Sequence, residues 1–96
     1  MVGLRPNRVT RNEAYRKRVL DNRFLEGDRY CVLERPRYLR TMKELSQHGV
    51  SDSTRLLEVG GGQIALMAEA LWGAQCTVAD LGTEYKESIT RFGVEH

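Results

Sequence analysis

The first half of the chain alternates apolar and polar positions with the period of an α-helix. Thr10 and Glu13 form a T-x-x-E capping box, which predicts a helix start. We expect this helix to end near Leu25, with Gly27 in the left-handed C-cap. The apolar positions at helical spacing in this segment are Tyr15, Val19, Leu20 and Phe24. They form a face that should be buried.

A second helical segment follows a short apolar run. Residues 30–33 (Tyr-Cys-Val-Leu) are too few to distinguish a strand from an extended loop. Pro36 suits the first position of a helix, and Gly49 stands where a C-cap would. The apolar stripe between them consists of Tyr38, Leu39, Met42 and Leu45. We therefore expect a flexible tail over residues 1–9 and an N-terminal helical segment over residues 10–50.

After the polar connection at residues 50–54, the pattern changes to short apolar runs that alternate with helical stretches. Residues 56–59 and 76–79 are predicted to be strands. The apolar positions of the two helical stretches are Ile64, Leu66, Met67, Ala70 and Leu71 in the first, and Tyr85, Ile89 and Phe92 in the second. Gly73 and Gly93 are expected to end these helices. The order strand, helix, strand, helix indicates an α/β unit with parallel strands over residues 55–96.

Candidate chemistry lies at the predicted turn after the first strand. Gly60, Gly61 and Gly62 let the backbone approach a ligand without Cβ clashes, beside the N–H groups that open the next helix. Asp80 follows the second strand, 20 residues after Gly60. Because adjacent parallel strands end at the same edge, we expect its carboxylate beside the turn, where it can accept hydrogen bonds from both hydroxyls of a ribose.

Two cofactor classes fit this geometry. Gly60-x-Gly62-x-x-Ala65 matches the G-x-G-x-x-A fingerprint of dinucleotide binding, which indicates NAD or FAD. Glu58 argues against a dinucleotide, since a carboxylate there would face a pyrophosphate but suits a ligand with an ammonium group. Glu58 is also placed to cap the next helix, and Asp80 to cap the last helix through the residues at 82–83.

Residues 56–62 (Leu-Leu-Glu-Val-Gly-Gly-Gly) and 73–80 (Gly-Ala-Gln-Cys-Thr-Val-Ala-Asp) resemble motifs I and II of the class I S-adenosylmethionine-dependent methyltransferases. The resemblance implies that Glu58 helps to hold the methionine end of S-adenosylmethionine. It also implies that the turn lines the cofactor, that Asp80 binds the ribose and that Leu81 contacts the adenine. Ile64 departs from the family pattern at the third glycine position.

The same resemblance implies an incomplete Rossmann-like methyltransferase fold, because the chain supplies only two or three of the family's seven strands. It assigns neither a methyl acceptor nor a catalytic base. Tyr30, Arg37 and Tyr38 are candidates to cover the cofactor's carboxylate. Since two parallel strands leave both sheet edges unpaired, we expect a homo-oligomer or a missing C-terminal half to complete the sheet.

Charge is unevenly distributed along the chain. Residues 1–50 carry twelve Lys and Arg against six Asp and Glu, whereas residues 51–96 carry three against seven, for a net charge of +2. An anionic partner such as RNA is one interpretation of the basic half. We favour solvated helix faces over nucleic acid, because the arginines are spread out and no aromatic residues are interleaved with them.

Several classes of protein are disfavoured by composition. No apolar run approaches the ~18 residues of a membrane span, and the N-terminus lacks the apolar core of a signal peptide. Cys31 and Cys76 lie far apart, so we expect two small buried thiols, no metal site and a cytoplasmic protein. The remaining alternatives to a methyltransferase are an NAD(P)-binding Rossmann fragment of an oxidoreductase and a non-enzymatic association module.

Overall fold

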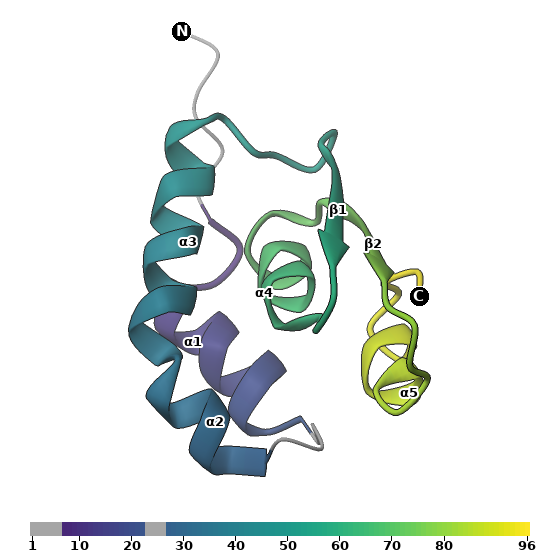
Figure 1. Cartoon of the computed structure of the whole chain (residues 1–96). Helices are drawn as coiled ribbons and strands as arrows, with labels where there is room; N and C mark the ends of the chain where they lie inside the picture. Colours follow the sequence, from purple (N-terminus) through teal and green to yellow (C-terminus); the bar gives the residue numbers. More distant parts are fainter. Residues whose placement is uncertain (1–6, 23–26) are drawn as a thin grey trace, which may run out of the picture.

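A computed structural model of the chain describes residues 7–22 and 27–96. Its elements are α1 (Arg11–Tyr15), the π-helix η1 (Arg16–Leu20), α2 (Gly27–Leu33), α3 (Arg35–Gln47), β1 (Arg55–Val59), α4 (Gln63–Trp72), β2 (Gln75–Ala79) and α5 (Lys86–Thr90). They form an α/β domain in which α4 lies in the middle, with α1 and α3 on one side and β1 on the other (Figure 1).

β1 and β2 pair in parallel, as the alternation of strands and helices predicts. The register runs from Arg55 opposite Gln75 to Val59 opposite Ala79. Glu95 adds a single parallel bridge to Thr77, with a 2.7 Å bond from the Val78 N–H to the Glu95 carbonyl oxygen. This bridge lies on the edge of β2 away from β1, so β2 has a neighbour on both sides.

Helix α4 is buried almost all round, whereas the sequence predicted one broad buried face. Eight of its ten residues are buried because α1, η1 and α3 cover one side and the two strands cover the other. The largest fully buried side chains of the described residues come from both halves of the chain: Tyr15, Val19, Tyr38, Met42, Leu66, Met67, Leu71, Val78, Ile89 and Val94. One hydrophobic core therefore joins the N-terminal helices to the α/β unit.

The predicted helix boundaries are mostly confirmed. The Thr10 side chain accepts a 3.1 Å bond from the Glu13 N–H, and the Glu13 carboxylate accepts one from the Thr10 N–H, so the capping box is present. Pro36 lies in the first turn of α3. After α3, Gly49 adopts φ +76°, and the Val50 N–H donates to the Leu45 carbonyl oxygen, which completes a Schellman motif.

Two predictions about the N-terminal half are wrong. The first helix ends at Leu20 after one π-helical segment rather than near Leu25, and Gly27 begins α2 instead of capping a helix. Phe24 and Leu25 lie outside the described residues. The apolar run at residues 30–33 is helical rather than extended. Only Cys31 of that run is buried, because a four-residue stretch on a helix turns most of its side chains away from the core.

Of the tail predicted over residues 1–9, residues 1–6 lie outside the described part. Residues 7 and 8 are held against α4. The Arg8 N–H donates to the Leu71 carbonyl oxygen at 2.8 Å, and the Trp72 indole N–H donates to Asn7 Oδ1 at 3.0 Å. These contacts hold the residues that precede α1 against the C-terminal end of α4.

The face of the sheet opposite α4 is open among the described residues. Leu57 and Val59 point to this face and are 64% and 82% exposed. Within residues 7–22 and 27–96, no helix is both long enough and apolar enough to cross a membrane.

Replacing Met42 with Ala tests the shared core. Met42 lies on α3 and has no exposed surface, so we expect Met42→Ala to lower the free energy of unfolding by about 2–5 kcal/mol. Leu33→Ala is the control, because Leu33 is 68% exposed and its loss should change stability by less than about 0.5 kcal/mol. Urea unfolding followed by circular dichroism measures both variants. Similar losses in the two variants would contradict a core that joins α3 to α4.

Candidate functional site

The glycine turn and Asp80 lie at one edge of the sheet, as expected for parallel strands. The Gly60 N–H donates a 2.8 Å hydrogen bond to the carbonyl oxygen of Ala79, the last residue of β2. This bond places the turn after β1 directly beside the residue that follows β2. The structure therefore brings the turn after β1 and the segment that follows β2 together at the carboxyl edge of the sheet, as the trace in Figure 1 shows.

All three glycines of the turn adopt positive φ values, +80° at Gly60, +71° at Gly61 and +133° at Gly62. A side chain at Gly62 would also collide with α5, since its Cβ would lie 2.6 Å from Ile89 Cδ1. A Cβ at Gly60 would meet nothing within 4 Å. A side chain at Gly62 would thus displace Ile89, whereas Gly60 faces open space that a ligand can enter.

Glu58 turns toward the start of α4 rather than away from the protein. Its Oε1 accepts a 2.7 Å hydrogen bond from the Ala65 N–H, in the first turn of the helix. The alternative in which Glu58 caps this helix is therefore observed. Burial raises the pKa of the Glu58 carboxyl, and backbone hydrogen bonds from Ala65, Gly62 and Ile64 partly oppose that rise.

Asp80 is exposed at the end of β2. Its Oδ1 accepts a 3.2 Å bond from the Gly82 N–H, which closes a tight turn after the strand. Asp80 does not cap the last helix, because α5 begins only at Lys86 and has no side-chain cap. Oδ2 makes no hydrogen bond within the described part of the chain. Next to it, the Leu81 side chain is fully exposed.

Three residues were proposed to cover a cofactor's carboxylate, and of these Arg37 is close enough for its charge to act on Glu58 at the carboxyl edge of the sheet. Its positive charge acts to lower the pKa of Glu58, although burial of that carboxyl outweighs the effect. Arg37 is itself held by Glu34, with 2.8 Å between Nε and Oε1. Tyr38 belongs to the core and is 1% exposed, so it does not cover the edge. Tyr30 is 42% exposed on α2.

Across residues 7–22 and 27–96, no three His, Cys, Asp or Glu side chains gather in a way that could hold a metal ion. The edge instead offers an open backbone turn, one exposed carboxylate and one exposed apolar side chain. These groups are suited to binding a ligand through hydrogen bonds and apolar contact.

No protein-family model matches the chain, and searches of the curated proteins and of the solved structures also found no match.

Alanine at Gly62 should be more damaging than alanine at Gly60. Both substitutions force a side chain into a positive-φ conformation, which costs about 1–2 kcal/mol near the left-handed region at Gly60 and more at Gly62, whose φ of +133° lies outside that region. Gly62→Ala adds the collision with Ile89, so its loss of unfolding free energy should be clearly larger. Chemical denaturation of both variants gives the comparison, and equal losses would contradict the close packing of α5 on the turn.

The raised pKa of Glu58 predicts a pH-dependent stability. The folded chain binds this proton more tightly than the unfolded chain, whose ordinary value is 4.5, so unfolding free energy should fall as the pH rises above about 4.5. Glu58→Gln keeps an acceptor for the Ala65 N–H but cannot titrate. We therefore expect the variant to gain stability relative to wild type between about pH 4 and pH 7.

Glu87→Gln is the matched control for this measurement, because it removes one carboxylate from an exposed position on α5. Urea unfolding of the wild type and the two variants is compared at about pH 4 and about pH 7. If the unfolding free energy of the wild type instead rose relative to that of Glu58→Gln as the pH increases, the backbone N–H groups rather than burial would determine the pKa of this carboxyl.

Proposed function

We propose that this chain binds S-adenosylmethionine at the carboxyl edge of β1 and β2, as the cofactor-binding part of a class I methyltransferase with an incomplete Rossmann-like fold. The observation that carries the proposal is the 2.8 Å bond from the Gly60 N–H to the Ala79 carbonyl oxygen. It holds an open glycine turn beside the exposed carboxylate of Asp80. A nucleoside lying against the turn would have its ribose within reach of that carboxylate.

The residues at the edge suit the parts of such a ligand. Asp80 keeps Oδ2 without a partner among the described residues, and an ionised carboxylate accepts hydrogen bonds from ribose hydroxyls. Leu81 presents a fully exposed apolar side chain beside it, which fits the face of an adenine. Gly60 leaves room for the ligand to approach the backbone.

The position of Glu58 favours a sulfonium nucleoside over a dinucleotide. Dinucleotide folds bind the pyrophosphate with the free N–H groups at a helix N-terminus. Here the Glu58 carboxylate already accepts the Ala65 N–H and hydrogen bonds with Gly62 and Ile64. A pyrophosphate would lose those donors and meet a carboxylate. S-adenosylmethionine carries positive sulfonium and ammonium groups and no phosphate.

In this proposal the chain positions the cofactor, and another part of the enzyme binds the substrate that accepts the methyl group. Methyl transfer depends largely on holding the acceptor in line with the sulfonium methyl group. The outer edge of β1 pairs with no other strand of the described residues, and Leu57 and Val59 leave its open face apolar. A second copy or a C-terminal half that completes the sheet would cover these positions.

A reducing compartment, the cytoplasm, is part of the same proposal. Cys31 and Cys76 are both buried and form no disulfide bond. Burial raises the pKa of the Cys76 thiol to about 11, which keeps it protonated and unreactive at neutral pH.

Isothermal titration with S-adenosylhomocysteine and with NAD tests the function. We expect the first ligand to bind and the second to show no heat of binding. Asp80→Asn should weaken S-adenosylhomocysteine about 10- to 100-fold, because hydrogen bonds to a charged acceptor contribute about 1.5–3 kcal/mol. Glu87→Gln, an equal change of charge on α5, should bind like wild type.

Preferential binding of NAD would overturn the proposal in favour of the oxidoreductase alternative. Absence of binding by either ligand would favour the association module. If Asp80→Asn and Glu87→Gln bound S-adenosylhomocysteine with equal affinity, Asp80 would not be part of the binding site. Circular dichroism melts of each variant confirm that the compared proteins are folded.

A further inference from the structure

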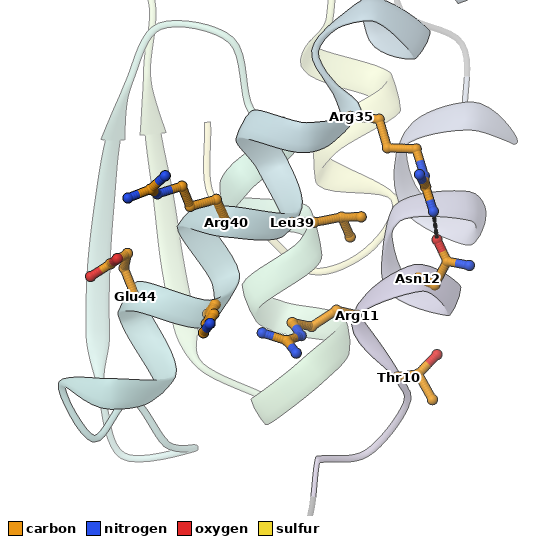
Figure 2. A pocket seen from close by; sticks show the side chains of 8 residues that line it. Thr10, Arg11, Asn12, Arg35, Leu39, Arg40 and Glu44 are labelled. Carbon is orange, nitrogen blue, oxygen red and sulfur yellow. Dashed lines mark hydrogen bonds between the residues drawn. The ribbon is translucent and has the colours of Figure 1, made fainter.

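A basic groove lies between the start of α1 and the length of α3, away from the glycine turn. Its volume is about 750 Å³. Its lining consists of Thr10, Arg11, Asn12, Arg35, Leu39, Arg40, Lys43 and Glu44. Four of these side chains are cations and one is a carboxylate. Figure 2 shows Arg35 reaching from α3 to Asn12 and Arg11 extending from α1 toward α3, while Arg40 and Glu44 project from α3 on the side away from Arg11 and Asn12.

The cations of the groove lack acidic partners among the described residues, whereas most of the other basic side chains in the N-terminal half have one. Five side chains outside the groove are paired with carboxylates at N–O distances between 2.8 and 3.9 Å. These are Arg8 and Arg18 with Glu69, Arg16 with Asp21, Lys17 with Glu13, and Arg37 with Glu34. Arg29 on α2 is exposed and unpaired within the described part.

Within residues 7–22 and 27–96, Arg11, Arg40 and Lys43 form no ion pair. Arg35 donates to the neutral Asn12 Oδ1 at 2.7 Å, so its charge is oriented but not cancelled. The groove therefore concentrates positive charge that the rest of the segment neutralises. Such a concentration attracts anions.

We propose that this groove binds the phosphate backbone of double-helical nucleic acid without reading its sequence. Arg35 and Lys43 are separated by about 12 Å along α3, at 1.5 Å per residue, and Arg40 projects from a different side of the helix (Figure 2). A nucleic-acid strand carries one phosphate per about 3.4 Å of helix axis, so this length faces several phosphates in succession. An extended polyanion can contact cations on both of these sides of α3, whereas a single phosphate group would contact only one side.

The other lining residues favour a duplex over an unpaired strand. Proteins that bind single strands stack bases on aromatic side chains, and none of the described residues that line this groove is aromatic. Leu39 is its one apolar side chain. Asn12 and Thr10 add neutral polar groups of the kind that contact phosphate oxygens. The chemistry available is contact with phosphates, which carries no direct information about sequence.

The inference is independent of the proposed cofactor site. All residues of the groove lie between positions 10 and 44, and none belongs to the glycine turn or to the end of β2. Binding of S-adenosylhomocysteine and binding of nucleic acid can therefore succeed or fail separately.

Fluorescence anisotropy with the full chain and a labelled duplex of about 16 base pairs, as DNA and as RNA, tests the proposal. Affinity is measured between about 50 and 200 mM salt. Arg40→Gln with Lys43→Gln should weaken binding at least about tenfold at low salt. It should also lower the salt slope by about 1.8, since each lost phosphate contact removes about 0.9.

Arg16→Gln with Lys17→Gln is the matched control, with the same loss of charge on exposed, ion-paired side chains of η1. It should change affinity by less than about twofold. Glu44→Gln should strengthen binding, because it removes the carboxylate from the groove. Arg11→Gln is a second variant on another helix, available if the double substitution on α3 lowers the melting temperature.

Three results would overturn the proposal. One is no binding of either duplex by the wild-type chain at about 50 mM salt. Another is an equal loss in the groove and control variants, which would indicate unspecific charge attraction. The third is tighter binding of anionic phospholipid vesicles or of inorganic triphosphate through the same residues, which would assign the groove to a different ligand.

Discussion

The structure depends on the burial of α4 from both sides. A helix that is apolar around most of its circumference requires cover on every face, and neither the sheet nor the N-terminal helices alone can supply it. α1, η1 and α3 pack on one side while β1 and β2 pack on the other. The position of α4 therefore determines where the glycine turn that begins it and the groove between α1 and α3 lie.

At the carboxyl edge of the sheet, a strained backbone turn lies next to contacts that stabilise the fold. Three successive positive-φ residues make the turn unusually dependent on glycine, and Ile89 packs where a side chain at Gly62 would be. Glu58 is partly buried at an energetic cost, but its carboxylate accepts the Ala65 N–H at the start of α4. This capping role and a role near a cationic ligand are compatible, because the same negative charge opposes phosphate and favours an ammonium group.

The two proposed sites use the uneven charge of the chain differently. The edge of the sheet contributes the carboxylate of Asp80 and is suited to a nucleoside with positive groups. The groove contributes cations that have no acidic partner among the described residues and is suited to a polyanion. Glu69 shows how the neutralisation elsewhere arises, since it pairs with both Arg8 and Arg18 from the N-terminal half. Together with the pairs inside the N-terminal half, this leaves the groove cations and the exposed Arg29 without an acidic partner among the described residues.

Local signals in the sequence determined the parts of the fold that depend on neighbours three or four residues away. The Thr10 capping box, the glycine after α3 and the order of strands and helices after residue 54 were all readable, because caps and apolar periodicity act within one or two turns. The meeting of the turn with Asp80 also followed from the rule that parallel strands end together. Only the tertiary structure decided the direction of Glu58, the burial of Tyr38 and the contact of Ile89 with Gly62. It alone also gathered Arg11 with the cations of α3, since these outcomes depend on how distant segments pack around α4.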